Sequence, residues 1–97
     1  MTVSTESTIS IDAAGNAAPL RPLGHATVSI NIRGDAPADY AVDIKTNSGS
    51  WIQDVITYSG SADYDDVIEQ PADDPRVRCT SGTAGSGDEA TVTLIAA

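Results

Sequence analysis

The residues from Tyr40 to Tyr58, YAVDIKTNSGSWIQDVITY, strongly favour a pair of antiparallel strands. Tyr40, Val42 and Ile44 fall on one face of an extended backbone, and the intervening residues on the other, as expected of a half-buried strand. Asn47 and Gly49 tolerate positive φ, and the serines beside them can hydrogen-bond their own backbone. The sequence therefore predicts a hairpin with its turn at residues 46–50.

The return strand, residues 51–58, has apolar side chains on both faces. Ile52, Ile56 and Tyr58 share one face, and Trp51 and Val55 share the other. A strand of this kind is covered on both sides or contains a bulge that switches faces. A chain of 97 residues has little material for a second internal layer, so a partner subunit could provide the cover.

The rest of the chain indicates more strands and no helix. Val, Ile and Thr supply 26 residues, and no stretch has a convincing 3.6-residue period. Strands are predicted at residues 2–12, 26–33, 67–68, 76–80 and 90–96, with turns at 34–37, 59–62 and 70–75. The predicted fold is all-β: an antiparallel β-sandwich, immunoglobulin/fibronectin-like or jelly-roll-like, with about six to eight short strands and little or no helix.

Residues 1–97 are predicted to form a single domain, in which residues 13–24 are a proline-containing loop or arm. Pro19 and Pro22 disfavour a central strand and favour extended backbone. Leu20 and Leu23 are the apolar residues of this segment, and two interpretations stay open for them. They tuck under the core as part of a connection, or they dock on a neighbouring subunit.

Charge restricts both the environment and the partners. The chain has 14 acidic residues against five basic ones, for a net charge of −9, and eleven of the acids are Asp. Because concentrated salt screens such repulsion, this composition favours a protein of a halophile over an ordinary acidic domain. No basic patch suits nucleic acid, and no apolar run is long enough for a membrane span. The polar start, MTVSTESTIS, does not resemble a secretory signal.

No residue pattern indicates catalysis, a cofactor or a metal site. His25 is the only histidine and Cys79 the only cysteine, too few for a zinc site or an internal disulfide. Cys79 is expected to be an inert apolar residue of its strand. Asp63, Asp65 and Asp66, with Glu69 nearby, could offer oxygens to a cation, but their spacing differs from an EF-hand loop. A hydrated acidic loop is the favoured interpretation, so we expect a protein that is not an enzyme.

Three aromatic side chains are candidates for a binding surface. Trp51, Tyr58 and Tyr64 could form a platform for a sugar or a protein partner, since amphipathic rings are enriched at interfaces. The alternative places Trp51 in the core, as is common for a lone tryptophan in a sandwich. Placement of Trp51 in the core is favoured. The platform stays a second interpretation, because residues 51–58 carry apolar side chains on both faces.

The second half of the chain, from about Tyr40 to Ala96, resembles small structural proteins of tailed viruses that infect haloarchaea. The shared pattern consists of Tyr40-x-Val42-Asp43, Trp51-x-x-Asp54, Thr57-Tyr58-Ser59, Val77-Arg78-Cys79-Thr80 and Ala90-x-Val92. Cys79 stands where Val is expected, and residues 1–24 lie outside the pattern.

The resemblance implies a virion component that is synthesised in the host cytoplasm and decorates or cements a capsid, or forms a turret or spike base. Its partners would be capsid proteins or other copies of itself, as a homo-oligomer. The predicted interface residues are Leu20, Leu23, Trp51, Ile52, Val55, Tyr58 and Tyr64. The alternative function is a carbohydrate or cell-surface binding module of a halophilic virus or archaeon, with affinity near Tyr58, Tyr64 and the loop at 81–89.

Overall fold

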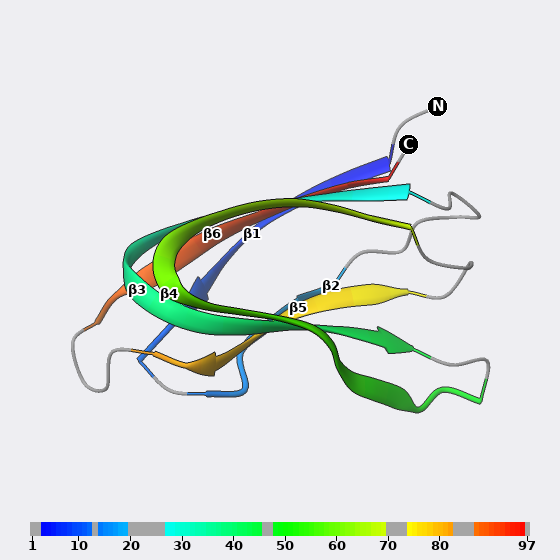
Figure 1. Cartoon of the computed structure of the whole chain (residues 1–97), viewed down its shortest axis with the longest axis horizontal. Coiled ribbons are helices and arrows are strands. Elements are labelled where there is room, and N and C mark those ends of the chain that lie inside the picture. Colours follow the sequence, from blue (N-terminus) through cyan, green and yellow to red (C-terminus); the bar gives the residue numbers. More distant parts are fainter. Residues whose placement is uncertain are drawn as a thin grey trace.

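A computed structural model describes residues 3–12, 14–19, 27–45, 48–69, 74–82 and 87–96 of the chain. These residues form six strands and no helix (Figure 1). The strands are β1 (Val3–Ser10), β2 (Ala17–Pro19), β3 (Thr27–Lys45), β4 (Trp51–Glu69), β5 (Pro75–Ser81) and β6 (Glu89–Ala96). All pairings are antiparallel and join the strands in one sheet of order β1-β6-β3-β5-β2, with β4 on the other edge of β3.

Strands β3 and β4, of 19 residues each, form a long bent hairpin that the whole sheet follows (Figure 1). The register shifts between Arg33, which pairs with Asp63, and Ala38, which pairs with Ser61. Residues 34–37 of β3 therefore lie opposite a single residue of β4, Ala62. Gly34 fits this bend because a Cβ there would lie 2.9 Å from the carbonyl oxygen of Ala62. On β4 the bend contains Gly60, whose φ of 89° suits glycine. The hairpin therefore continues through the bend with its two strands still paired.

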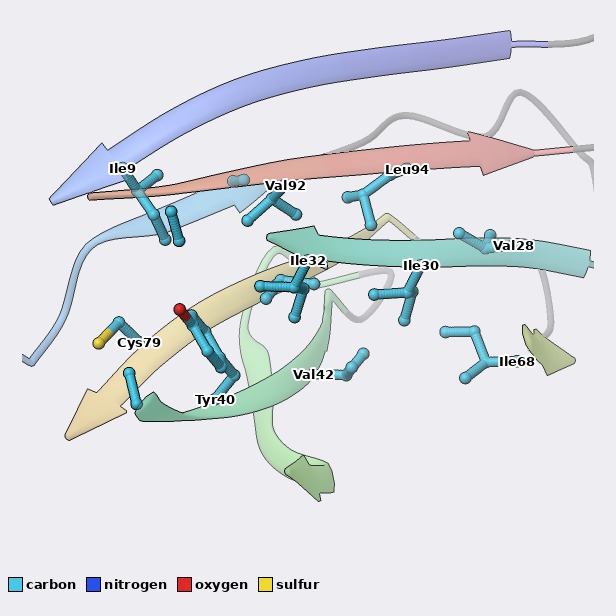
Figure 2. Close-up of a cluster of buried hydrophobic side chains, with 14 of the residues drawn as sticks. Ile9, Val28, Ile30, Ile32, Tyr40, Val42, Ile68, Cys79, Val92 and Leu94 are labelled. Atoms are coloured by element: carbon cyan, nitrogen blue, oxygen red, sulfur yellow. The ribbon is translucent and has the colours of Figure 1, made fainter. Parts of the chain in front are cut away.

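The bend brings two halves of the sheet face to face. The first part of β3 pairs with β6 through Val28–Gly34, and the later part pairs with β5 through Asp39–Ile44. Figure 2 shows side chains from both halves pointing into the space between them. This core is aliphatic apart from Tyr40 and Cys79, and it includes Ile30, Ile32, Val42, Val77, Val92 and Leu94. Alternation puts these residues inside because every second side chain of a strand points to the same face.

The connection from β1 to β2 draws the free edges of the sheet together. The Ile11 amide donates to the Asp88 carbonyl oxygen at 3.0 Å, and the Gly15 amide donates to the Cys79 carbonyl oxygen at 2.8 Å. Gly82 lies so close to Ile11 that a Cβ on it would be 1.5 Å from the Ile11 carbonyl oxygen. The sheet is thus nearly closed, with Ile11 fully buried at the closure.

The predicted all-β, antiparallel fold is confirmed, and the six described strands lie within the predicted number. Two details of the prediction are wrong. The expected turns at 34–37 and 59–62 lie inside the continuous strands β3 and β4, because bulges absorb their extra residues without ending the pairing. The strands are accordingly not all short, and they share one folded sheet. Among the described residues, no helix is long and apolar enough to cross a membrane.

Candidate interaction surface

A bulge near the start of β4 shapes its outer surface. Val42 pairs with Ile56 and Ile44 with Ile52, so one residue of β3 lies opposite three of β4, residues 53–55, and Asp54 within this bulge has a φ of 58°. Aspartate tolerates this left-handed conformation better than most residues. A bulge is therefore present, but it is not the predicted kind that switches faces. It inserts two residues, so alternation resumes beyond it on the same faces.

Asp43 lies opposite the bulge and is completely buried, although it was expected on a polar face. Its Oδ2 accepts hydrogen bonds from the Nε atoms of Arg76 and Arg78, both at 2.8 Å. Its Oδ1 accepts from the backbone N–H of Asp54 at 3.0 Å. Register explains the geometry, since β5 places Arg76 directly across from Asp43 and Arg78 across from Ala41.

Asp54 completes the group by accepting a 2.6 Å hydrogen bond from Arg78 through its carboxylate. The resulting ion network, which consists of Asp43, Asp54, Arg76 and Arg78, has two formal charges of each sign. Burial by itself raises the pKa of Asp43, but the hydrogen bonds from Arg78, Arg76 and the Asp54 amide outweigh it and hold that pKa below its ordinary value. Asp43 is therefore an ionised structural anchor that ties β3, β4 and β5 together.

Trp51 is half-buried on the outside of this network. The Arg76 guanidinium carbon lies 4.0 Å from the centre of the Trp51 ring, within the range of a cation–π contact. Ile52 and Val55 are the neighbouring apolar residues of β4, and they are 55% and 39% exposed. The favoured placement of Trp51 in the core is wrong, because Trp51 pairs with Lys45 and so falls on the outer face.

The tyrosines lie elsewhere, on the inner side of the bend. Tyr64 packs against Tyr40 and Tyr58, with ring centres 5.7 and 5.4 Å apart. Tyr64 Oη donates to the Ala38 carbonyl oxygen at 3.0 Å, and Tyr58 Oη donates to Asp66 at 2.7 Å. Seven residues of extended chain, roughly 20 Å, separate Tyr58 from Trp51. The structure therefore does not bring Trp51, Tyr58 and Tyr64 together as one platform.

Tyr40 is the innermost of the three tyrosines. Its hydroxyl has no hydrogen-bond partner among the described residues, and burial raises its pKa to about 12. Cys79 is also fully buried, and burial raises the pKa of its thiol. A thiol in such surroundings is an apolar packing group.

The acidic residues expected in a hydrated loop belong to the regular part of β4. Asp65 faces outward, where Arg33 contacts both carboxylate oxygens at 3.1 Å, whereas Asp66 faces inward toward Tyr58. Alternation thus sends neighbouring carboxylates to opposite faces. The part of the chain that the structure describes contains no group of three residues suited to hold a metal ion.

Leu20, Pro22 and Leu23 of the arm, His25, and Asn47 of the expected turn lie outside the described residues. Sequence reasoning overlooked the ion network. The available signal was an aspartate inside the apolar alternation of residues 40–44, together with arginines at two outward positions of the strand at 76–80.

No protein-family model matches this sequence, and no curated protein matches it significantly. Comparison of structures finds the SPBc2 prophage-derived protein YomS, with a TM-score of 0.62 and 10% identity, over 100% of this chain and 97% of that one. A mutant of the family 29 carbohydrate-binding module CBM29-2, in complex with cellulohexaose, matches with a TM-score of 0.47 and 12% identity. That match covers 97% of this chain and 91% of the module. At such identities, the likeness to YomS establishes a shared fold.

Proposed function

We propose that this chain is a non-enzymatic structural protein of a virion that infects a halophilic archaeon. In this role it decorates or cements the capsid, or forms the base of a turret or spike, through packing between subunits in high salt. The opposed halves of the folded sheet serve as the two layers of a compact, sandwich-like building block. The resemblance of residues 40–96 to haloarchaeal virus proteins and the net charge of −9 support the setting.

The observation that carries the proposal is the apolar patch at the start of β4, which extends over both faces of the strand: Trp51 points to the outer face, Ile52 pairs with Ile44 and points to the other, and Val55 lies in the bulge. Ile52 and Val55 are 55% and 39% exposed, so no described residue covers them fully, and no described strand pairs with the second edge of β4. Fully burying an aliphatic side chain of this size contributes about 1.5–3 kcal/mol. A second copy would bury the patch twice in a two-fold interface.

The ion network makes the patch a stiff surface. The Arg76 guanidinium packs on the Trp51 ring and donates a hydrogen bond to Asp43. The side chains of Trp51 and Arg76 therefore have little rotamer freedom left to lose on association. Tryptophan and arginine are also the residues most enriched at the energetic centres of interfaces. The patch therefore suits subunit packing.

Native mass at molar salt tests this proposal. We expect the wild-type chain to form a defined oligomer, and the Ile52→Ser/Val55→Ser double variant to be largely monomeric. Val67→Ser removes an equally exposed side chain from the other end of β4 and is the matched control, which should assemble like wild type. A wild-type monomer, or a double variant with unchanged mass, would contradict the proposal.

A further inference from the structure

Strand β1 is the last strand of the sheet beyond β6, and no described strand pairs with its outer edge. It runs beside β6 along its whole length (Figure 1), in one unbroken register from Val3 opposite Ala96 to Ser10 opposite Glu89. The strand contains no glycine and no proline, and its one charged residue is Glu6. Its outer edge is therefore regular, uninterrupted and nearly uncharged.

The hydrogen bonds at the end of β1 show which backbone groups point to this outer edge. The Ile11 N–H donates to the Asp88 carbonyl oxygen at 3.0 Å, and these two residues continue the register of β1 with β6. Hydrogen-bonded pairs alternate along an antiparallel ladder, so the odd-numbered residues of β1 bond to β6 and the even-numbered residues point outward. Ser10 agrees with this, because its carbonyl oxygen accepts a hydrogen bond from Asn16 Nδ2 at 3.0 Å. The outward groups before Ser10 have no partner in the described part of the chain.

The other edges of the sheet are protected against strand addition. Along β4, side chains accept hydrogen bonds from the N–H groups of Ser61, Asp63 and Val67, and bulges interrupt the register. Strand β4 also carries five acidic residues. Strand β2 has three residues and ends with Pro19. Natural sheets block edge pairing with such features, and β1 lacks all of them apart from its single charge.

We propose that a second copy of this chain binds the outer edge of β1 with its own β1, antiparallel, about a two-fold axis at Thr5. Ser4 of each copy then exchanges two backbone hydrogen bonds with Glu6 of the other copy, and the two Thr5 residues lie opposite each other. Because the axis is perpendicular to the sheet, the sheet continues from one copy to the next with the same face outward.

Charge and existing hydrogen bonds select this register. An axis at Glu6 would place two carboxylates directly opposite each other, which is unfavourable. An axis at Ser7 would need the Ser10 carbonyl oxygen, which Asn16 already occupies. An axis at Thr5 avoids both problems. It also places the added strand beside the part of β1 whose inward side chains are only half-buried.

The low charge of this edge favours a second copy over a charged partner. Glu6 is the one charge that the edge presents, so a basic or an acidic segment finds little to recognise there. In the two-fold pair Glu6 lies opposite a serine, and the two Glu6 residues are diagonal neighbours about 7–8 Å apart. Molar salt, with a screening length of about 3 Å, weakens their repulsion.

The contact is weak and independent of the patch of Trp51, Ile52 and Val55. Two hydrogen-bonded pairs correspond to a dissociation constant of about 1 mM, so the contact is not populated in a native mass measurement at micromolar concentration. It forms where another interface already holds copies close together, because the local concentration is then high. Two different two-fold contacts on one chain would link copies into an extended array.

Nuclear magnetic resonance on Ile52→Ser/Val55→Ser in molar salt tests the proposal, because this variant lacks the patch. We expect the amide signals of Ser4 and Glu6 to shift as the protein concentration rises to about 1 mM, and the signals of the odd-numbered residues to shift less. A mixture of isotope-labelled and unlabelled chains should show a nuclear Overhauser effect between the Hα protons of Thr5 in the two copies.

Proline variants in the same background locate the contact. Ser4→Pro removes an outward N–H and no bond to β6, so the fold tolerates it and self-association should weaken about tenfold or more. Thr8→Pro is the matched control on the same edge, since Thr8 would lie opposite a residue that precedes β1 in the second copy. Signals independent of concentration, unchanged association by Ser4→Pro, an equal loss in Thr8→Pro, or no effect between the two Thr5 residues would overturn the proposal.

Discussion

At the scale of single residues, the position of Asp43 is decided by two arginines and one backbone amide. A carboxylate that is completely buried is costly unless it is paired and hydrogen-bonded. Here Arg76, Arg78 and the Asp54 amide supply those partners. Removal of the negative charge would leave two largely buried guanidinium groups without their shared partner.

Asp43→Asn should lower the free energy of unfolding by about 3–5 kcal/mol, the usual cost of breaking a buried ion pair from one side. The substitution keeps the size of the side chain, so the loss reports charge and hydrogen bonding. Urea denaturation at pH 7 measures it. Asp54→Asn is the matched control, and we expect a loss of less than about 1 kcal/mol because that carboxylate is mostly exposed. Equal losses for the two variants would contradict the assignment.

The same network predicts a pH dependence. The pKa of Asp43 is lower in the folded than in the unfolded chain, so its stabilisation is present above the unfolded value of about 3.9. That stabilisation is lost as pH falls through the folded pKa. We therefore expect the difference in unfolding free energy between wild type and Asp43→Asn to be constant from pH 7 to about pH 5, and to shrink as pH falls further. A difference that stays the same down to pH 2 would show that Asp43 is not the group responsible.

At the scale of elements, the bend of the β3–β4 hairpin depends on where each strand takes its extra residues. The bulge at residues 34–37 lengthens β3, and extra residues near Gly60 and Asp54 lengthen β4, so both strands end with 19 residues. Balanced bulges let one sheet turn over without a break in pairing. The bend therefore depends on a few positions that admit no larger side chain.

Gly34→Ala should destabilise the fold by about 1–2 kcal/mol, because the added Cβ meets the Ala62 carbonyl oxygen at 2.9 Å. Thermal unfolding measures the effect. Ser59→Ala changes an exposed residue on the β4 side of the bend and should stay within about 0.5 kcal/mol of wild type. If both variants had the same melting temperature as the wild type, the bend would not depend on the close approach at Gly34.

Gly82→Ala should have the larger effect, about 3 kcal/mol or more, since backbone atoms of Ile11 occupy the position of its Cβ. The conflict is between two backbones, so no side-chain rotation relieves it. The exposed neighbour Ser81 gives the control Ser81→Ala. Hydrogen exchange should show the earliest loss of protection at the Ile11 and Gly15 amides, which join β1 and β2 to the rest of the sheet. Protection equal to that of wild type at both amides would contradict this explanation.

At the scale of the whole molecule, repulsion among the acidic residues destabilises the compact fold, and salt weakens this repulsion by screening it. The net charge of −9 on 97 residues repels itself in the compact state. The screening length falls from about 30 Å at 0.01 M salt to about 3 Å at 1 M. The proposed assembly through the apolar patch would meet less repulsion in concentrated salt for the same reason.

The melting temperature should rise by about 5 °C or more between 0.01 and 1 M NaCl, which corresponds to about 1 kcal/mol. A Glu6→Gln/Asp63→Asn variant removes two exposed charges and should show a smaller rise, with a higher melting temperature at low salt. Comparison at low protein concentration keeps self-association out of the measurement. A salt response identical in the two proteins would show that screening of net charge is not its cause.

Alternation of apolar side chains by itself determined that this chain is all-β, and it put Tyr40, Val42 and Ile44 on one face, where the structure buries all three, because a period of two needs no knowledge of distant contacts. The two-faced pattern of residues 51–58 left two explanations open, cover on both sides or a bulge that switches faces, whereas the bulge near Asp54 inserts two residues and keeps the faces. Only the tertiary structure decided that residues 34–37 and 59–62 bend strands rather than end them, since their pairing across the hairpin offsets the local turn preference. The burial of Asp43 and the outward place of Trp51 likewise depend on which strand lies beside which, a long-range choice that local pattern does not encode.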